Sequence, residues 1–225
     1  MKRRQTSNDF YPVNHAELCR KTTIHEAGHA AAIYLGNKQK QLPPVFFQFY
    51  IKEQRNHFHL SRSLSLLNDK CIAKLEDDRL IQALPLSIEK ATKDISSEQM
   101  QAYECAFQAD VVSLLVGPLA EAKYVAMRDG ELINSRLVNL NALHNYGGSP
   151  DLEIINEYLD WFIVEEAERQ KKISDLFLQA FSFINDRTNW LAITVLAYYI
   201  LAGRMNTIEC EEVIPYLIPR LSNID

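Results

Sequence analysis

The sequence predicts a mainly helical α+β fold that includes a small β-sheet. Two observations favour helices: the 225 residues contain only seven glycines and eight prolines, and several runs repeat apolar side chains at helical spacing. The sheet is predicted from residues 45–51, a run of aromatic and β-branched side chains that follows two prolines. No linker clearly divides the chain. Residues 1–14 are therefore expected to form a flexible tail and residues 15–225 a single domain.

The first half of this domain is expected to combine one helix with two strands. A helical pattern runs from His15 to Leu35 and stops at Gly36-Asn37, a pair that commonly ends helices. A strand is expected at Val45–Ile51, and the alternating segment His57–Leu60 is a candidate for its hairpin partner. Residues 66–93 show no clear period, and short helices are expected there.

The second half is expected to be helical throughout. Ser96 and Gln99 have the spacing of a capping box, which predicts a helix from this point to about Met127, ended by Asp129-Gly130. Ser149-Pro150-Asp151 suits a helix start, with a capping serine followed by proline and an acidic residue. Further helices are expected at Ser149–Asn185, Thr188–Leu201 and Ile208–Leu217.

Composition and charge exclude several classes of protein. A net charge of −5 argues against a nucleic-acid partner. The longest apolar run, Trp190–Ala202, is too short to span a bilayer, and the first thirty residues contain no apolar segment typical of a signal peptide. The four cysteines are scattered and make no ligand pair, so they are interpreted as reduced thiols in a cytoplasmic protein.

The residues that indicate chemistry lie in the first predicted helix, where residues 25–29 read His-Glu-Ala-Gly-His. Positions i and i+4 of a helix share one face, so both imidazoles can reach one metal ion at the roughly 2.0–2.1 Å that zinc requires. Glu26 lies too far round the helix to be a ligand, but it can take a proton from metal-bound water. His25 and His29 are therefore candidate zinc ligands, and Glu26 is the candidate catalytic base.

Glu26 also has a purely structural interpretation. Thr23 and Glu26 fit the spacing of a capping box, which would place a helix start at Thr23. The helical pattern begins several residues earlier, near His15, which weakens that alternative. The apolar residues that follow, Ala30–Ile33, suit a helix buried beside a metal site. The motif therefore favours metal binding.

A hydrolytic zinc site needs three protein ligands and one open position, and the sequence offers several candidates for the third. Asp151 lies at a predicted helix start, where a carboxylate is also favoured by the helix dipole. Glu121 lies on a second helix, and it could either ligate the metal or hydrogen-bond a ligand imidazole. The remaining candidates are Asp110, His57, His59 and His144.

Several segments of the chain resemble the peptidase domain of the FtsH-type ATP-dependent zinc metallopeptidases. His-Glu-Ala-Gly-His-Ala at residues 25–30 is similar to the family's zinc motif. Residues 114–121 resemble its Leu-Gly-Gly-Arg-Ala-Ala-Glu helix, although Pro118 and Leu119 replace Gly and Arg. Residues 148–152 resemble the loop that supplies the family's third ligand, an Asp followed by Leu, and residues 190–201 resemble a late helix. The resemblance implies a zincin-like helical fold with Asp151 as the third zinc ligand.

The same resemblance implies a zinc metalloendopeptidase that hydrolyses unfolded proteins or peptides by a zinc-activated water. The chain contains no phosphate-binding loop, so its own cleavage is expected to be independent of ATP. A separate ATPase partner and a homo-oligomer both remain open. The strand at residues 45–51 is a candidate edge for binding a peptide by strand addition. The alternative function is a non-catalytic zinc-binding interaction or regulatory module.

Overall fold

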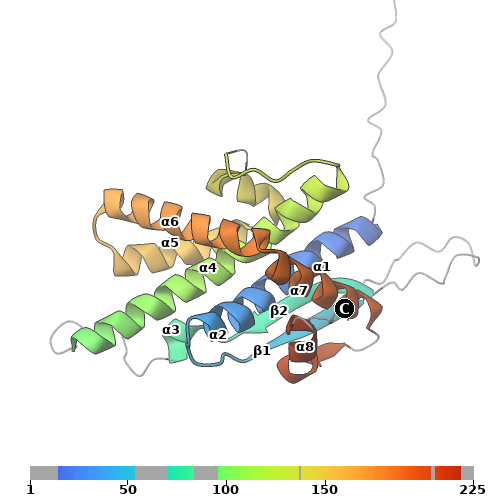
Figure 1. The fold of residues 1–225 in the computed structure, drawn as a ribbon, viewed down its shortest axis with the longest axis horizontal. Coiled ribbons are helices and arrows are strands. Elements are labelled where there is room, and N and C mark those ends of the chain that lie inside the picture. Colours follow the sequence, from blue (N-terminus) through green and yellow to red (C-terminus); the bar gives the residue numbers. More distant parts are fainter. Residues whose placement is uncertain (1–14, 54–69, 84–95, 137, 204–205, 219–225) are drawn as a thin grey trace, which may run out of the picture.

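The structure, a computed structural model, describes residues 15–53, 70–83, 96–136, 138–203 and 206–218. It confirms a mainly helical domain with a small antiparallel sheet. Figure 1 shows α4 (Ser97–Arg128) as the long central helix, with α5 and α6 along one side and α1, the sheet and α7 on the other. Because α4 packs against α1, α5 and α6, it forms the centre of the core.

Helix α4 begins and ends as the sequence predicts. The Ser96 hydroxyl accepts a hydrogen bond from the Gln99 backbone N–H, and the Gln99 side chain accepts one from the Ser96 N–H. The helix ends at Arg128 with Asp129 as its C-cap, and Gly130 follows with a φ of +76°, the left-handed conformation that glycine adopts without strain. Most side chains between Tyr103 and Ala122 are buried, so α4 presents apolar surface on nearly every side.

The first helix is longer than predicted. Helix α1 (His15–Ala31) continues into a π-helical turn, η1 (Ala32–Gly36), and then into the short α2 (Asn37–Gln39). The prediction that Gly36-Asn37 ends the helix is therefore wrong. Gly36 has helical angles, φ −64° and ψ −46°, because glycine permits the left-handed conformation of a helix end but does not require it.

The sheet has the strand order β2-β1-β3. Strand β1 (Phe47–Glu53) pairs with β2 (Lys70–Asp77) on one side and with β3 (Thr207–Glu209) on the other. The predicted strand at residues 45–51 is thus central, and the prediction that it offers a free edge is wrong. Its predicted partner, His57–Leu60, lies outside the described residues.

Two of the sheet's strands come from segments that were predicted to be helical. Residues 70–77 form β2 because Leu75 pairs with Phe49 across the sheet, and among the described residues of that region the short α3 (Leu80–Ala83) is the one helix. Ile208 pairs with Phe49 from the other side, so α8 (Cys210–Leu217) begins two residues later than predicted. In β2 and β3, pairing with the distant strand β1 therefore outweighs the local sequence pattern that suggested helices.

The predicted helix at residues 149–185 is two helices, α5 (Ser149–Phe162) and α6 (Glu166–Asn185). The chain is extended at Ile163, with φ −133° and ψ 115°, where two successive β-branched residues disfavour a helix. Helix α7 (Arg187–Ala202) agrees with prediction, and the N–H groups of Thr188 and Asn189 in its first turn are capped by the Asp186 carboxylate. A 3₁₀ segment, η3 (Leu140–Tyr146), precedes α5.

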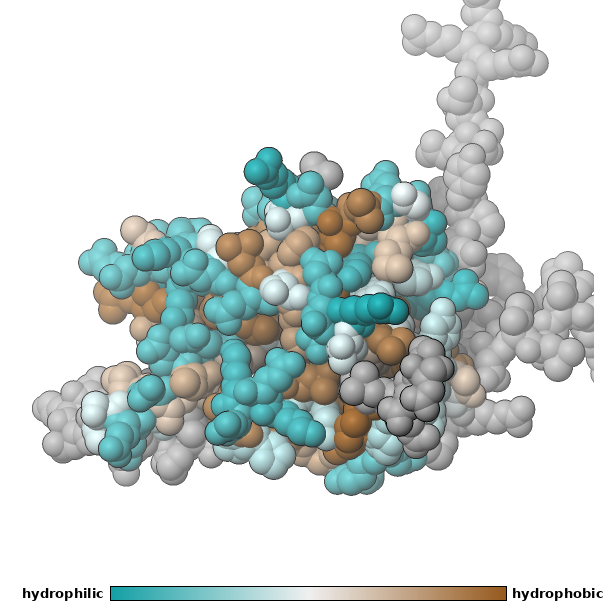
Figure 2. Space-filling model, viewed as in Figure 1, coloured by the Kyte–Doolittle hydropathy of each residue, from teal (hydrophilic) through white to brown (hydrophobic). Residues whose placement is uncertain are grey.

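One face of the molecule is largely polar (Figure 2), and the cysteines differ in their bonding. The face in Figure 2 is mostly hydrophilic and is interrupted by separate apolar patches. Helix α4 is the one described helix that is long and apolar enough to cross a membrane, and 83% of its most apolar window is buried inside the fold. Cys19 is disulfide-bonded, which corrects the interpretation of every cysteine as a reduced thiol. Cys105 and Cys210 are free.

Candidate metal centre

Helix α1 places His25 and His29 side by side on one buried face. Each residue is only 7% exposed, and the two ring centroids lie 4.8 Å apart at an interplanar angle of 69°. The i, i+4 spacing in a continuous helix produces this arrangement, as the sequence predicts. Both rings turn their Nε2 atoms toward the start of α5.

Asp151 completes a group of three potential ligands. One carboxylate oxygen lies 3.3 Å from His25 Nε2, and the other lies 3.5 Å from His29 Nε2. The ligand atoms of the three residues all lie within 4.8 Å of one another. Asp151 lies in the first turn of α5, directly after Pro150, so the helix start fixes its position. The structure therefore brings together the three residues that were predicted as ligands.

The far nitrogens of both imidazoles contact backbone carbonyls. His29 Nδ1 lies 2.7 Å from the Ser113 carbonyl oxygen, and His25 Nδ1 lies 3.1 Å from the Tyr146 carbonyl oxygen. A carbonyl can only accept, so each Nδ1 carries the proton and donates it. Each Nε2 of a neutral ring is then free to offer its lone pair to a metal.

Glu121, the second candidate for third ligand, contacts the far side of His25. Its carboxylate lies 3.4 Å from His25 Nδ1, the nitrogen that points away from His29 and Asp151. In this position Glu121 orients the imidazole and increases its electron density. The structure therefore supports the hydrogen-bonding role that the sequence left open for this residue.

Two glycines let the site close around the histidines. A Cβ on Gly117 of α4 would lie 2.7 Å from His29 Cδ2 and closer still to Nε2 and Cε1. A Cβ on Gly147, whose φ is +71°, would lie 3.2 Å from His25 Nδ1 and 3.3 Å from the Glu121 carboxylate. Only glycine allows these rings to rest directly on backbone, and no spacing in the sequence revealed this contact.

Helix α4 supports the site along a single stripe. Ser113 supplies the carbonyl for His29, Gly117 supplies the space for its ring, and Glu121 supplies the carboxylate for His25. These residues are four positions apart, so they lie on one face of the helix. Gly28 of α1 faces the same stripe: a Cβ there would lie 2.9 Å from the Ala120 Cβ.

Glu26 lies beside this group and is held by the sheet. One of its carboxylate oxygens accepts a hydrogen bond of 2.9 Å from the backbone N–H of Leu75 in β2. Burial raises the pKa of Glu26 to about 7, against the opposing effects of His25 and of the Leu75 N–H. A carboxylate with a pKa near neutrality is well matched to accepting and returning a proton.

The ligand residues themselves have widely separated pKa values when no metal is bound. Burial opposes a charge on His25, but the hydrogen bonds with Asp151 and Glu121 outweigh it and raise the pKa to about 10. Burial lowers the pKa of His29 to about 4. Burial also opposes ionisation of Asp151, yet the two imidazoles hold its pKa below the usual range. Without a metal ion, this group therefore carries one extra proton at neutral pH, which is held mainly by His25.

The other predicted candidates do not join the group. Asp110 caps α3 instead, because its two oxygens accept hydrogen bonds from the backbone N–H groups of Leu80 and Ile81. His144 is exposed, and its Nδ1 lies 3.0 Å from the Ser149 hydroxyl. The last two candidates, His57 and His59, lie outside the described residues.

The donor set fits a zinc ion. Two imidazole nitrogens and one carboxylate are the ligands of many catalytic zinc sites, which keep a fourth position open. Carbonyl partners for both far nitrogens, together with Glu121, provide the outer support that such ligands require. The chain matches no protein-family model, no curated protein and no solved structure.

Proposed function

We propose that this chain is a zinc metalloendopeptidase that hydrolyses peptide bonds in unfolded proteins or short peptides. The observation that supports the proposal is Glu26, a carboxylate with a pKa near 7 that lies beside three clustered ligand residues. Glu26 also accepts the Leu75 N–H, so its position beside the ligand residues, together with its raised pKa, is what favours proton transfer. The resemblance to the FtsH-type peptidases is consistent with this proposal.

In the proposed mechanism, His25 and His29 would hold zinc through Nε2, and Asp151 would hold it through its carboxylate. When bound, zinc would lower the pKa of a coordinated water and polarise the scissile carbonyl. Glu26 accepts a proton from the attacking water and later gives it to the leaving amine. The Leu75 N–H orients the Glu26 carboxylate during both transfers. Ser113, Tyr146 and Glu121 keep the imidazoles in place.

The edge of β2 is the proposed binding surface for the peptide substrate. Among the described strands, β2 pairs only with β1, so its other side is unpaired. The Leu75 N–H points away from β1 and toward Glu26, which shows that this free side faces the ligand cluster. Residues at intervals of two, Ala73 and Asp77, direct their backbone groups to the same side. A peptide added there as a strand would pass beside Glu26.

Cleavage itself is proposed to need no nucleotide, because proton transfer through Glu26 and zinc requires none and the sequence has no phosphate-binding loop. Folded proteins would resist a peptidase that reads extended backbone. A separate ATPase partner that unfolds them would extend the range of substrates. An unfolded protein such as casein is therefore the appropriate first substrate.

The experiment compares wild type with Glu26→Gln in casein cleavage, with and without ATP and a chelator. The glutamine keeps the shape of the side chain but cannot accept the proton, so the variant should bind zinc normally and lose turnover. ATP should have no effect, and the chelator should abolish cleavage. Cleavage that persists unchanged in Glu26→Gln would exclude the mechanism. Stoichiometric zinc with no cleavage in either protein would instead favour the non-catalytic zinc-binding module.

A further inference from the structure

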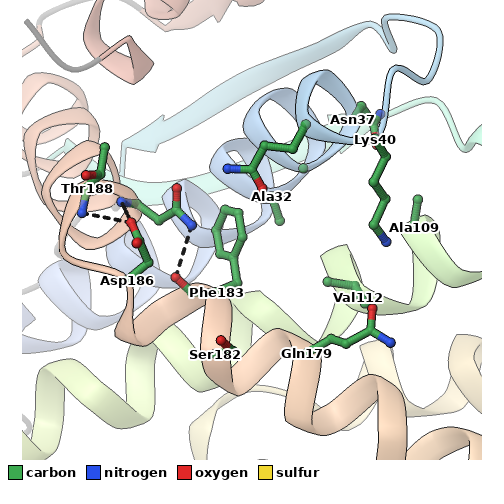
Figure 3. A pocket seen from close by; sticks show the side chains of 13 residues that line it. Ala32, Asn37, Lys40, Ala109, Val112, Gln179, Ser182, Phe183, Asp186 and Thr188 are labelled. Carbon is green, nitrogen blue, oxygen red and sulfur yellow. Dashed lines mark hydrogen bonds between the residues drawn. The ribbon is translucent and has the colours of Figure 1, made fainter.

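A pocket lies apart from the metal centre, lined by η1 and α2 on one side, by α4, and by the corner where α6 meets α7. Its volume is about 560 Å³, within the roughly 300–1,000 Å³ that small-molecule sites occupy. Ala32, Ala109 and Val112 form an apolar part of its lining. Figure 3 shows Lys40 at one end of the pocket and Asp186 with Thr188 at the other.

The lining carries polar groups whose hydrogen-bonding capacity is unused. Asn37 is only 6% exposed, yet its side-chain amide makes no hydrogen bond with any described residue. The side-chain amides of Gln39 and Gln179 likewise have no partner in the part of the chain that the structure describes. These amides are open to solvent in the pocket, where they can both donate to and accept from a bound ligand.

The two ends of the pocket carry opposite charges. Lys40 is exposed, and its ammonium forms no ion pair within the described ranges, so this cation has no counter-ion from the protein there. At the other end, one oxygen of the Asp186 carboxylate caps α7 by accepting from Thr188 and Asn189. The second Asp186 oxygen has no hydrogen-bond partner among the described residues and remains able to accept.

We propose that this pocket binds a short zwitterionic peptide. Lys40 binds the terminal carboxylate, Asp186 binds the terminal ammonium, and the amides of Asn37 and Gln179 pair with the peptide groups between them. Side-chain amides both donate and accept, which matches a peptide group better than a phosphate, and one lysine supplies the charge that one carboxylate needs. None of these residues contacts the metal ligands, so the pocket does not depend on the proposed peptidase activity.

The π-helical turn η1 supports a binding role and provides the means to test it. Such turns are rare and often occur at functional sites, and this one lines the pocket through Ala32 and Gly36. A Cβ added at Gly36 would meet no atom within 4 Å, and the backbone angles there suit any residue. A larger side chain at this position can therefore fill the pocket without disturbing the helix.

The test is a calorimetric titration of trialanine into the full chain carrying Glu26→Gln, which prevents cleavage of the probe. Adding Lys40→Gln should weaken binding by roughly tenfold or more, the loss expected for one charge-assisted hydrogen bond. Gly36→Leu should abolish binding. The matched control is Lys38→Gln, which removes an exposed lysine that lies over the Tyr34 ring, outside the pocket, and should change nothing.

Two chemical variants of the probe test the assigned ends. Trialanine amidated at its C-terminus should lose the Lys40-dependent part of the affinity, and N-acetylated trialanine should lose the part due to Asp186. No binding at millimolar trialanine, or binding that survives both Lys40→Gln and Gly36→Leu, would overturn the proposal. Melting curves check that each variant is folded. If Gly36→Leu does not fold, Lys40→Gln still tests the proposal.

Discussion

Replacing Gly117 with alanine should disable the metal centre while leaving the fold intact. The new Cβ would lie 2.7 Å from His29 Cδ2 and closer to two other ring atoms, whereas ordinary contact begins near 3.4 Å. The ring must therefore move by about 1 Å, while zinc sites tolerate ligand displacements of only ~0.2 Å. The His29 ring cannot move freely, because Nδ1 is held by the Ser113 carbonyl at 2.7 Å.

The expected result is a loss of zinc affinity of at least about 100-fold, because even an outer partner of a zinc ligand is worth 10–100-fold. Affinity is measured by competition with a fluorescent chelator, and folding is checked by circular dichroism. The matched control is Gly36→Ala, which places a methyl group in open space on a helical backbone. It should keep full zinc affinity and gain about 0.5–1 kcal/mol of stability. A folded Gly117→Ala protein that binds zinc as tightly as wild type would refute the packing argument.

Three further predictions concern individual side chains. His25 has a pKa of about 10 without metal, so zinc must displace one proton from it at pH 7. The zinc affinity should therefore rise about tenfold per pH unit until pH 10. Calorimetric titrations in buffers of different ionisation enthalpy should detect the released proton. Glu121→Gln should weaken zinc binding by about 10-fold, whereas Asp151→Ala should weaken it far more, and equal losses would contradict their different positions. Asp110→Ala leaves two α3 N–H groups without an acceptor and should cost about 2 kcal/mol in urea unfolding, with zinc affinity unchanged.

The parts of the site that follow from local structure were predictable from the sequence. The spacing of His25, Glu26 and His29 depends only on helical geometry, and α1 begins well before the motif and continues into η1 after it. The capping box of α4 and the position where α5 starts are also local signals, although the prediction of Ser149 as the capping residue is wrong: Gly148 is the N-cap, and no side chain among the described residues caps α5. Asp151 is different: its position at a helix start was visible, but its choice as third ligand relied on a resemblance between sequences.

What the sequence did not reveal depends on contacts between distant segments. The close approach of His29 to Gly117 joins two helices, and a glycine within a helical pattern does not indicate its neighbour. Strand order is likewise a tertiary property, so β1 was predicted as an edge although β2 and β3 cover both of its sides. Residues 70–77 become a strand because β1 is there to pair with them.

The stripe of Ser113, Gly117 and Glu121 makes the centre sensitive to insertions and deletions. Each residue of an α-helix turns the chain by about 100°, so one residue inserted between Ser113 and Glu121 would rotate Glu121 away from His25. The same insertion before Ser96 would leave the stripe intact. The number of residues between Ser113 and Glu121 is therefore fixed by the metal centre. Within this stretch, Gly117 is the position that tolerates substitution least. Homologous chains that share this centre should differ in the loops before α4 and keep its central turns free of gaps.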